Sequence, residues 1–285
     1  MQEGIVGLDI SPSSIAMVNS RKASLNPFCM EVDDTRNKIS LIQRKMSRSL
    51  RLNNPNNYED DRVVINTNNN KVLKLGKVKK GSKKWFKSKR YTDLQKSCLE
   101  LQRKMVASRK CSHGKMVNDI LSCGNIIKTE KLSYKSFQKM FGKSVGFRAP
   151  GLFLEILRRK AERAGSKVIE FNTRTTALSQ VCHCVNKRKK ELKERWHRCE
   201  SCGISAQRDL YSAFLAQYVE DNILDTSEAK LSWASADILL EQAVSSLNKT
   251  ATRKTCLSSF GLGQSQSGLL VKKESIPNKA LDVVA

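Results

Sequence analysis

The chain has 285 residues, 39% of them hydrophobic, and a formal net charge of +25. This apolar fraction suffices for one sizeable core plus a small module, and no run approaches the roughly 18 apolar residues of a membrane span, which excludes a membrane-spanning protein. The positive charge is far beyond what solubility requires, so it favours a polyanionic partner, and nucleic acid is the usual one.

The N-terminal part of the chain is expected to begin with two strands. Residues 4–10 and 14–18 are apolar runs on either side of a Ser-Pro-Ser turn. Residues 33–52 repeat apolar side chains at helical spacing between basic ones, which predicts a helix. Residues 62–66 and 71–78 flank an Asn-rich turn and predict a hairpin.

A second helix is expected to begin near Thr92, because Thr92 and Gln95 have the spacing of a capping box. Residues 124–130 predict a strand. The helix expected over 150–165 is bounded by a proline and a glycine, and residues 167–171 predict the next strand.

The C-terminal part is expected to be mainly helical. Residues 208–218 predict a helix with an apolar stripe, and residues 222–248 predict one or two more. Residues 250–285 are rich in Ser, Lys and Gly and are expected to be poorly ordered. The apolar side chains expected to organise the segment 222–248 are Trp233, Ile238 and Leu239. Strands and helices are mixed along the chain, so the fold class is α/β or α+β.

The basic residues are concentrated in one segment. Residues 71–110 hold fifteen Lys and Arg against Asp93 and Glu100, whereas residues 222–285 are nearly balanced. A solvated helix face usually mixes both signs, so this excess predicts a surface that faces phosphates. The expected contacts are Lys79, Lys80, Lys83, Lys84, Lys87, Lys89 and Arg90, together with Arg158, Arg159 and Lys160.

Four cysteines form the most specific motif. Cys182 and Cys184 are a Cys-x-Cys pair, and Cys199 and Cys202 are a Cys-x-x-Cys pair. Two thiolate pairs joined by a loop of this size can close a tetrahedral zinc site of the ribbon type, and Gly203 allows a tight turn under the second pair.

Two alternatives accompany the four-sulfur site. His183 or His197 could replace one sulfur as a ligand, although four sulfurs are preferred. A disulfide reading is disfavoured, because the nine cysteines are odd in number and no secretory signal precedes them. The other five cysteines, at 29, 98, 111, 123 and 256, have no metal-binding spacing and are assigned ordinary roles.

Three acidic residues stand out by position. Asp9 lies inside the first apolar strand, Glu130 ends a later strand, and Asp209 lies in the first turn of the helix after the cysteines. Singly, each has an ordinary explanation as a turn former or a helix N-terminal acid. If their strands are neighbours, the three carboxylates converge at one end of the sheet and would hold two Mg²⁺ or Mn²⁺ ions.

The motifs around these residues resemble the C-terminal half of the OrfB/TnpB proteins of bacterial insertion sequences. "VGLDI" is similar to the family's first acidic motif and places it at Asp9. "IIKTEKL" is similar to the second and places it at Glu130, and "QRDLYSA" is similar to the third and places it at Asp209. "TTALSQVCHC" and "HRCESCG" resemble the family's zinc ribbon. The resemblance covers about residues 4–220.

The resemblance implies an α/β, RNase H-like (RuvC-like) nuclease with a mixed sheet flanked by helices and an inserted zinc ribbon. It divides the chain into a core over 1–180, a ribbon over 181–204, a final core helix over 205–221 and an extension over 222–285. It implies structural Zn²⁺, catalytic Mg²⁺ or Mn²⁺, DNA as the substrate, and guide RNA as a partner in intact members, which are related to type V CRISPR effectors. The expected location is the bacterial cytoplasm, in association with the nucleoid.

The sequence departs from the family at two places. Its first cysteine pair is Cys-x-Cys, and residues 11–13 are Ser-Pro-Ser where the family has Gly and a polar or basic residue. The wedge and recognition half that precedes the nuclease in full members is also expected to be missing, which makes a separate N-terminal half a candidate partner.

Two functions therefore compete. The first is a divalent-metal DNA endonuclease module of an insertion-sequence protein. The second is a truncated nucleic-acid-binding remnant with a zinc ribbon and no useful cleavage. A zinc ribbon of the ribosomal or transcription type is a third reading, but it would not need three acids placed in this way.

Overall fold

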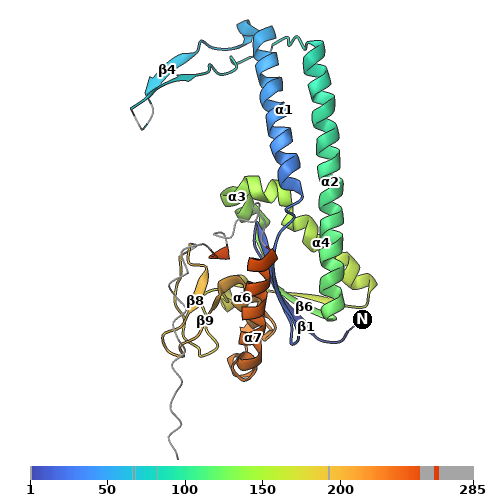
Figure 1. The fold of residues 1–285 in the computed structure, drawn as a ribbon, viewed down its shortest axis with the longest axis vertical. Coiled ribbons are helices and arrows are strands. Elements are labelled where there is room, and N and C mark those ends of the chain that lie inside the picture. Colours follow the sequence, from blue (N-terminus) through green and yellow to red (C-terminus); the bar gives the residue numbers. More distant parts are fainter. Residues whose placement is uncertain are drawn as a thin grey trace, which may run out of the picture.

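A central five-stranded sheet organises the protein (Figure 1). The structure is a computed structural model that describes residues 2–65, 67, 69–81, 83–191, 193–250 and 260–262. The strand order is β3-β2-β1-β6-β7, in which β1 to β3 are antiparallel and β6 and β7 run parallel to β1. The strands are β1 (Ile5–Ile10), β2 (Ser14–Val18), β3 (Ala23–Pro27), β6 (Ile126–Glu130) and β7 (Lys167–Phe171).

Four of these strands were predicted from the sequence and β3 was not. The sequence of β3, ASLNP, has an asparagine and ends on a proline, which are poor strand formers. It pairs along its whole length with β2, from Ser14↔Pro27 to Val18↔Ala23. The neighbouring strand therefore stabilises a segment whose own pattern is too weak to identify.

The two faces of the sheet carry separate cores because side chains alternate along β1. Val6, Leu8 and Ile10 are buried with side chains of α2 (Lys89–Cys123) and α4 (Pro150–Arg163). The opposite face packs against α6 (Arg208–Ala216) and α7 (Thr226–Thr250). The prediction of a mixed α/β sheet flanked by helices, with an inserted cysteine cluster, is confirmed.

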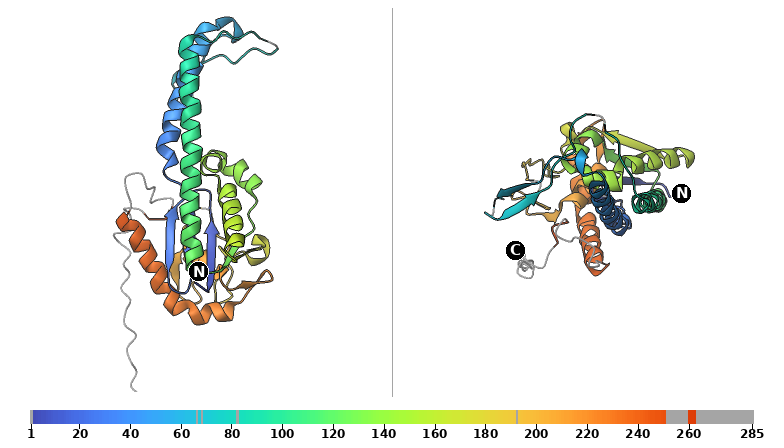
Figure 2. Two further views of the ribbon diagram at one scale, coloured as in Figure 1. Left: turned by 90° about the vertical axis from the view of Figure 1, so that its right-hand side faces the viewer. Right: turned by 90° about the horizontal axis from the view of Figure 1, so that it is seen from above.

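A long helical arm extends from this body. It consists of α1 (Val32–Asn53) and α2, which lie side by side (Figures 1 and 2) and share a small core. The arm ends in a short 3₁₀ helix (Pro55–Asn57) and a two-stranded ribbon of β4 (Arg62–Ile65) and β5 (Lys71–Lys74). The helix predicted over 33–52 and the hairpin are confirmed. The residues of the arm core are Cys29, Val32, Ile39, Cys98 and Met105.

Helix α2 begins earlier than the sequence predicts. Ser88 is its N-cap, and the Ser88 hydroxyl accepts a hydrogen bond from the backbone N–H of Tyr91 at 3.3 Å. The Thr92 hydroxyl instead donates to the Lys89 carbonyl within the first turn, at 2.6 Å. The capping box at Thr92 was therefore wrong, because a serine one turn upstream already satisfies the free amides.

Helix α3 (Tyr134–Arg148) was not predicted. Its sequence contains Gly142 and Gly146 and has only weak amphipathic character, and Phe141 breaks the helical dihedrals inside it. By contrast, α4 begins at Pro150 as expected, and Gly165 follows its end with a φ of +69°. A very short helix, α5 (Thr173–Thr176), follows β7.

Four short strands and one long helix occupy the C-terminal part of the described chain, on either side of α6. Strands β8 (Trp196–Arg198) and β9 (Ser205–Gln207) form the cysteine ribbon, and β10 (Val219–Glu220) pairs with β11 (Ile223–Leu224). Helix α7 is continuous, and its orientation corrects one expectation. Ile238 is 59% exposed, whereas Ala229, Ala236, Leu240, Ala243 and Leu247 face the core.

The expectation of disorder over 250–285 falls mostly outside the described residues. Phe260 and Leu262 are buried against the cysteine ribbon, and the Trp196 indole N–H donates to the Gly261 carbonyl at 3.1 Å. This short segment is therefore ordered by packing.

Within the described ranges, no helix combines the length and the apolar character needed to cross a bilayer.

Candidate functional site

The four predicted cysteines meet at one point. The sulfur atoms of Cys182 and Cys202 are 3.5 Å apart, those of Cys184 and Cys199 are 3.4 Å apart, and all four lie within 4.8 Å of one another. Tetrahedral zinc with bonds of about 2.3 Å would place its sulfurs about 3.8 Å apart. The geometry therefore fits one zinc ion held by four sulfurs, as preferred from the sequence, with neither histidine in the cluster.

Local turns bring the sulfurs together. Gly203 has a φ of +73°, and its N–H bonds to the Cys199 carbonyl at 2.9 Å, which confirms the turn predicted under the second pair. On the first pair, Val185 adopts the same left-handed region with a φ of +72°, and its N–H bonds to the Cys182 carbonyl. A β-branched residue is strained there, so the compact Cys-x-Cys pair has an energetic cost.

Neighbouring groups also act on the sulfurs. Burial raises the pKa of Cys182 well above its usual value. Burial opposes ionisation of Cys199 too, but hydrogen bonds, first from the Cys202 backbone, lower the pKa of Cys199 to about 6. Metal ligation requires thiolates, so the lowered pKa of Cys199 favours cation binding, whereas the raised pKa of Cys182 opposes it. The Tyr211 hydroxyl lies 3.5 Å from the Cys182 sulfur as a donor and accepts from the His183 N–H at 3.0 Å.

The three predicted acids lie on two adjacent strands and one helix. In the parallel pair β1–β6, Leu8 is opposite Thr129, so Asp9 and Glu130 follow side by side at the same end of the sheet. Lys128, two residues before Glu130, donates to the Gln217 carbonyl at the end of α6. Because side chains alternate, Glu130 is on the same face as Lys128, toward α6.

Helix α6 approaches β1 very closely. A Cβ on Gly7 would lie 1.9 Å from the Ala213 carbonyl oxygen, so only glycine permits this contact. Gly7 and Asp9 share the face toward α6. Since Asp209 lies one helical turn before Ala213, the close contact brings the Asp209 carboxylate toward Asp9. Gly7, two residues before Asp9, therefore helps to set the position of Asp209.

Electrostatic interaction links the three carboxylates. Burial, then Asp209, then Glu130 raise the pKa of Asp9 well above its usual value, while Arg208 and Arg195 act against the rise. Burial raises the pKa of Glu130 to about 7. Asp209 is only 4% exposed, and its Oδ2 atom lacks a hydrogen-bond partner among the described residues.

One buried and two partly buried carboxylates that repel one another are a donor set for hard cations. The acids are more open than the cysteines, however. Within the described residues, only the four cysteines form a group of three or more potential ligands compact enough to surround one ion as they stand. A two-ion site is wider, because the ions themselves lie about 3.5–4 Å apart.

Two arginines lie beside Asp209 and were missed from the sequence. An Arg195 guanidinium nitrogen lies 3.9 Å from Asp209 Oδ2, and Arg208 Nε lies 3.6 Å from Asp209 Oδ1. Arg208 also donates to the Glu194 carbonyl of the ribbon at 2.6 Å. Arg208 directly precedes the acid in "QRDLYSA", which was a usable signal. Arg195 had no such signal in the sequence, because only the fold of the cysteine ribbon brings it beside Asp209.

The predicted basic contacts occupy two separate places. Those from Lys79 to Arg90 lie at the far end of the arm and the start of α2 (Figure 1), and most are exposed. Two of the three on α4 have protein partners. Arg158 pairs with Glu170, and Lys160 donates to Asn118 at 2.6 Å and to the Gly114 carbonyl at 3.2 Å.

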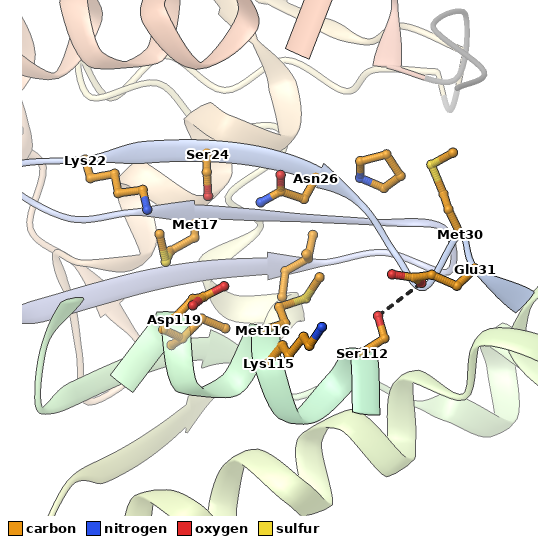
Figure 3. Close-up of a pocket in the computed structure, with 13 residues that line it drawn as sticks. Met17, Lys22, Ser24, Asn26, Met30, Glu31, Ser112, Lys115, Met116 and Asp119 are labelled. Atoms are coloured by element: carbon orange, nitrogen blue, oxygen red, sulfur yellow. Dashed lines mark hydrogen bonds between the residues drawn. The ribbon is translucent and has the colours of Figure 1, made fainter. Parts of the chain in front are cut away.

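A pocket lies away from the carboxylates, between β2, β3 and α2 (Figure 3). It has a volume of about 550 Å³, and its wall combines Met17, Met30 and Met116 with charges of both signs. One dashed contact in the figure joins the Ser112 hydroxyl to Glu31 at 3.2 Å. None of Asp9, Glu130 and Asp209 lines it, so it is not a candidate for phosphodiester chemistry.

Comparison with known proteins agrees with the ribbon half of this site. Residues 151–215 match the family model described as Cas12f1-like, TNB domain. The matched segment contains the four cysteines, both arginines and Asp209, and its similarity supports a relation of the chain to the TnpB and Cas12-like proteins. No curated protein matches the chain.

Proposed function

We propose that this chain is the nuclease module of a TnpB-like insertion-sequence protein and cuts DNA with two divalent cations. The observation that carries the proposal is the electrostatic linkage of Asp9, Glu130 and Asp209, whose buried Oδ2 atom lacks a hydrogen-bond partner among the described residues, beside a segment similar to a Cas12f1-like TNB domain. The mixed sheet, with three antiparallel strands followed by two parallel ones, supports an RNase H-like core over 1–180 and 205–221 with the ribbon over 181–204.

The proposed chemistry assigns roles to the chain's own groups. The three carboxylates would hold two Mg²⁺ or Mn²⁺ ions, which supply a nucleophilic hydroxide and stabilise the leaving oxygen of a phosphodiester. Arg195 and Arg208 are placed to balance carboxylate charge and to contact the phosphate. In this proposal the zinc site takes no direct part, because four sulfurs leave no open position.

Exposed lysines of the arm would bind the nucleic-acid backbone without reading bases. Guide RNA is a proposed partner that would deliver the DNA strand to the carboxylates. The support for it is the resemblance of the motifs, together with the TNB-domain match that relates the chain to TnpB and Cas12-like proteins.

The decisive experiment is a cleavage assay on the purified chain, with and without RNA transcribed from its flanking sequence. We expect nicking of single-stranded DNA with Mg²⁺ or Mn²⁺, none with EDTA, and none for Asp209→Asn. Asp93→Asn, on the exposed side of α2, is the matched control and should cleave normally. Metal-dependent cleavage that persists in Asp209→Asn would refute the assigned site.

The second candidate is a nucleic-acid-binding remnant. The observation in its favour is that the carboxylates are less compact than the cysteines. It predicts DNA binding without cleavage under every combination of metal, substrate and RNA. Mg²⁺ binding by calorimetry separates the two, because a remnant that has lost the site would release no heat that depends on Asp209.

A further inference from the structure

The β4–β5 ribbon at the end of the arm is exposed on both faces (Figures 1 and 2). Antiparallel pairing places Val63 opposite Leu73 on one face and Val64 opposite Val72 on the other. Val63 and Ile65 are each 66% exposed and Leu73 is 61% exposed. A free two-stranded ribbon with apolar faces gains little from its own packing, so its sequence implies contact with another molecule.

The ribbon is held rigidly at its base, which distinguishes it from a loose insertion. Arg51 of α1 pairs with Asp61 at 3.2 Å, and Asp61 accepts from the Gly76 N–H at 2.7 Å. Asn54 exchanges two hydrogen bonds with the Phe86 backbone, at 2.7 and 2.9 Å. These contacts tie both ends of the ribbon to the helical arm, so the arm sets its direction.

The charge of the segment identifies the kind of partner. Between Arg62 and Thr92 the chain has no acidic residue and many lysines. On the ribbon, Arg62 pairs with Lys74 on one face, and Lys71 pairs with Ile65 on the other. Each face therefore combines apolar side chains with cations. A second copy of the ribbon would repel this charge, and a polyanion would complement it.

The shape of the β4–β5 ribbon indicates which kind of polyanion it fits. The major groove of B-form DNA is about 12 Å wide and admits a two-stranded β-ribbon. The major groove of an A-form RNA helix is too narrow and deep for side chains to read. Apolar side chains on a ribbon can contact thymine methyl groups, while cations at its strand ends reach the flanking phosphates.

From these observations we propose that the β4–β5 ribbon is a docking arm that enters the major groove of duplex DNA. This site is separate from the carboxylates. Helix α2 has 35 residues and is therefore about 50 Å long, which corresponds to about 15 base pairs of B-form DNA. The ribbon would hold a duplex well outside the cleavage site. The inference rests on the proposed function only in taking DNA as the nucleic acid.

The test uses the full chain and fluorescence anisotropy with a DNA duplex of about 24 base pairs and an RNA duplex of the same sequence. One variant removes charge, by Arg62→Gln, Lys71→Gln and Lys74→Gln. A second removes apolar surface, by Val63→Thr, Ile65→Thr and Leu73→Thr, which keeps strand-forming residues. The control removes three exposed charges elsewhere, by Lys167→Gln, Lys230→Gln and Lys249→Gln.

The charge variant should bind the DNA duplex about tenfold more weakly or worse, and the slope of log K against log salt should become less negative by about two to three, because each phosphate contact contributes about 0.9. The apolar variant should lose affinity severalfold with an unchanged slope, and only for DNA. Methylation of guanine N7 should interfere with binding of the wild-type chain. The control should stay within about twofold.

Equal binding by the ribbon variants and the control would overturn the proposal, as would equal losses on RNA and DNA. Loss of self-association in the apolar variant, seen by sedimentation with DNA binding intact, would assign the surface to a second copy and also overturn it. Failure of the proposed nuclease would look different, since Asp209→Asn would then match wild type while the ribbon variants still lost duplex binding. A far-ultraviolet circular dichroism spectrum equal to that of the wild type shows that each variant is folded.

Discussion

The cysteine cluster and the carboxylate cluster both draw on the segment from Cys182 to Asp209, yet they are built in opposite ways. The cysteines are close in sequence, and tight turns hold their sulfurs within 4.8 Å of one another. The acids come from β1, β6 and α6, and burial raises the pKa of Asp9 and Glu130. The cysteine site is assembled by local turns, whereas the carboxylates are brought together by the sheet and α6, where Asp209 and Glu130 help to raise the pKa of Asp9.

The largest expected effect tests the carboxylate site. Glu130→Ala should lower Mg²⁺-dependent cleavage by about 10²–10³-fold or more, the scale on which one stabilising group acts in a preorganised site. DNA binding should be unchanged or slightly stronger, because a negative charge is removed from the phosphate path. Parallel cleavage and anisotropy measurements check this, with Glu155→Ala on the exposed side of α4 as the control. A Glu130 variant that cleaves normally would remove this residue from the site.

The next effect tests whether the cysteine site supports the carboxylate site. Cys199→Ser should reduce zinc below about half an equivalent in freshly purified protein while the sheet core stays folded, since the ribbon is an insertion. Cleavage should also fall, because Arg195 and Arg208 are held beside Asp209 by the ribbon. Elemental analysis measures the zinc content, and circular dichroism measures whether the core stays folded. Full zinc occupancy in this variant would contradict the four-sulfur site.

A smaller effect concerns the link between the clusters on α6. Tyr211→Phe removes the hydroxyl that donates toward the Cys182 sulfur, and loss of such an outer contact lowers metal affinity by about 10–100-fold. Competition with a chromogenic chelator measures this directly. Tyr218 lies just beyond the end of α6 and has no cysteine contact among the described residues. Tyr218→Phe should therefore keep the wild-type zinc affinity. Equal zinc affinity in both variants would limit Tyr211 to packing.

The smallest effect is a pH dependence of stability. Burial raises the pKa of Glu130 from 4.5 to about 7, so the folded state binds more protons than the unfolded state between these values. The stability from this group is complete below about pH 4.5 and is lost as pH rises through 7. Glu130→Gln should therefore stabilise the metal-free protein at pH 7.5 by on the order of 1–3 kcal/mol, and much less at pH 4.5.

His113 changes stability in the opposite direction. Burial lowers the pKa of His113 to about 4, so this group destabilises the protein as pH falls from 6.5 toward 4. Comparing wild type with Glu130→Gln at each pH in urea cancels that contribution. Adding Mg²⁺ should stabilise wild type and not the variant. A difference between the two proteins that does not vary with pH would show that the Glu130 carboxyl is not held protonated.

Much of the cysteine site could be predicted from the sequence because its determinants are local. The pair spacing and Gly203 act over a few residues, and the structure places all four sulfurs together as predicted. The strands around Asp9 and Glu130 were also predicted, because apolar runs bounded by turns depend on near neighbours. Strand β3 and helix α3 were missed for the converse reason, since their own patterns are weak and their neighbours stabilise them.

The tertiary structure alone decided how the distant residues meet. Nothing in the local sequence states that β6 pairs beside β1, that Gly7 allows α6 to approach within contact, or that the ribbon turns Arg195 toward Asp209. The first two contacts join residues more than a hundred positions apart, and the second also depends on the absence of a Cβ on Gly7. The sequence by itself determined the ligand types and the local turns. Packing of the sheet against α6 determined how the acids lie relative to one another, because carboxylates that repel one another are brought together only by a core that forms around them.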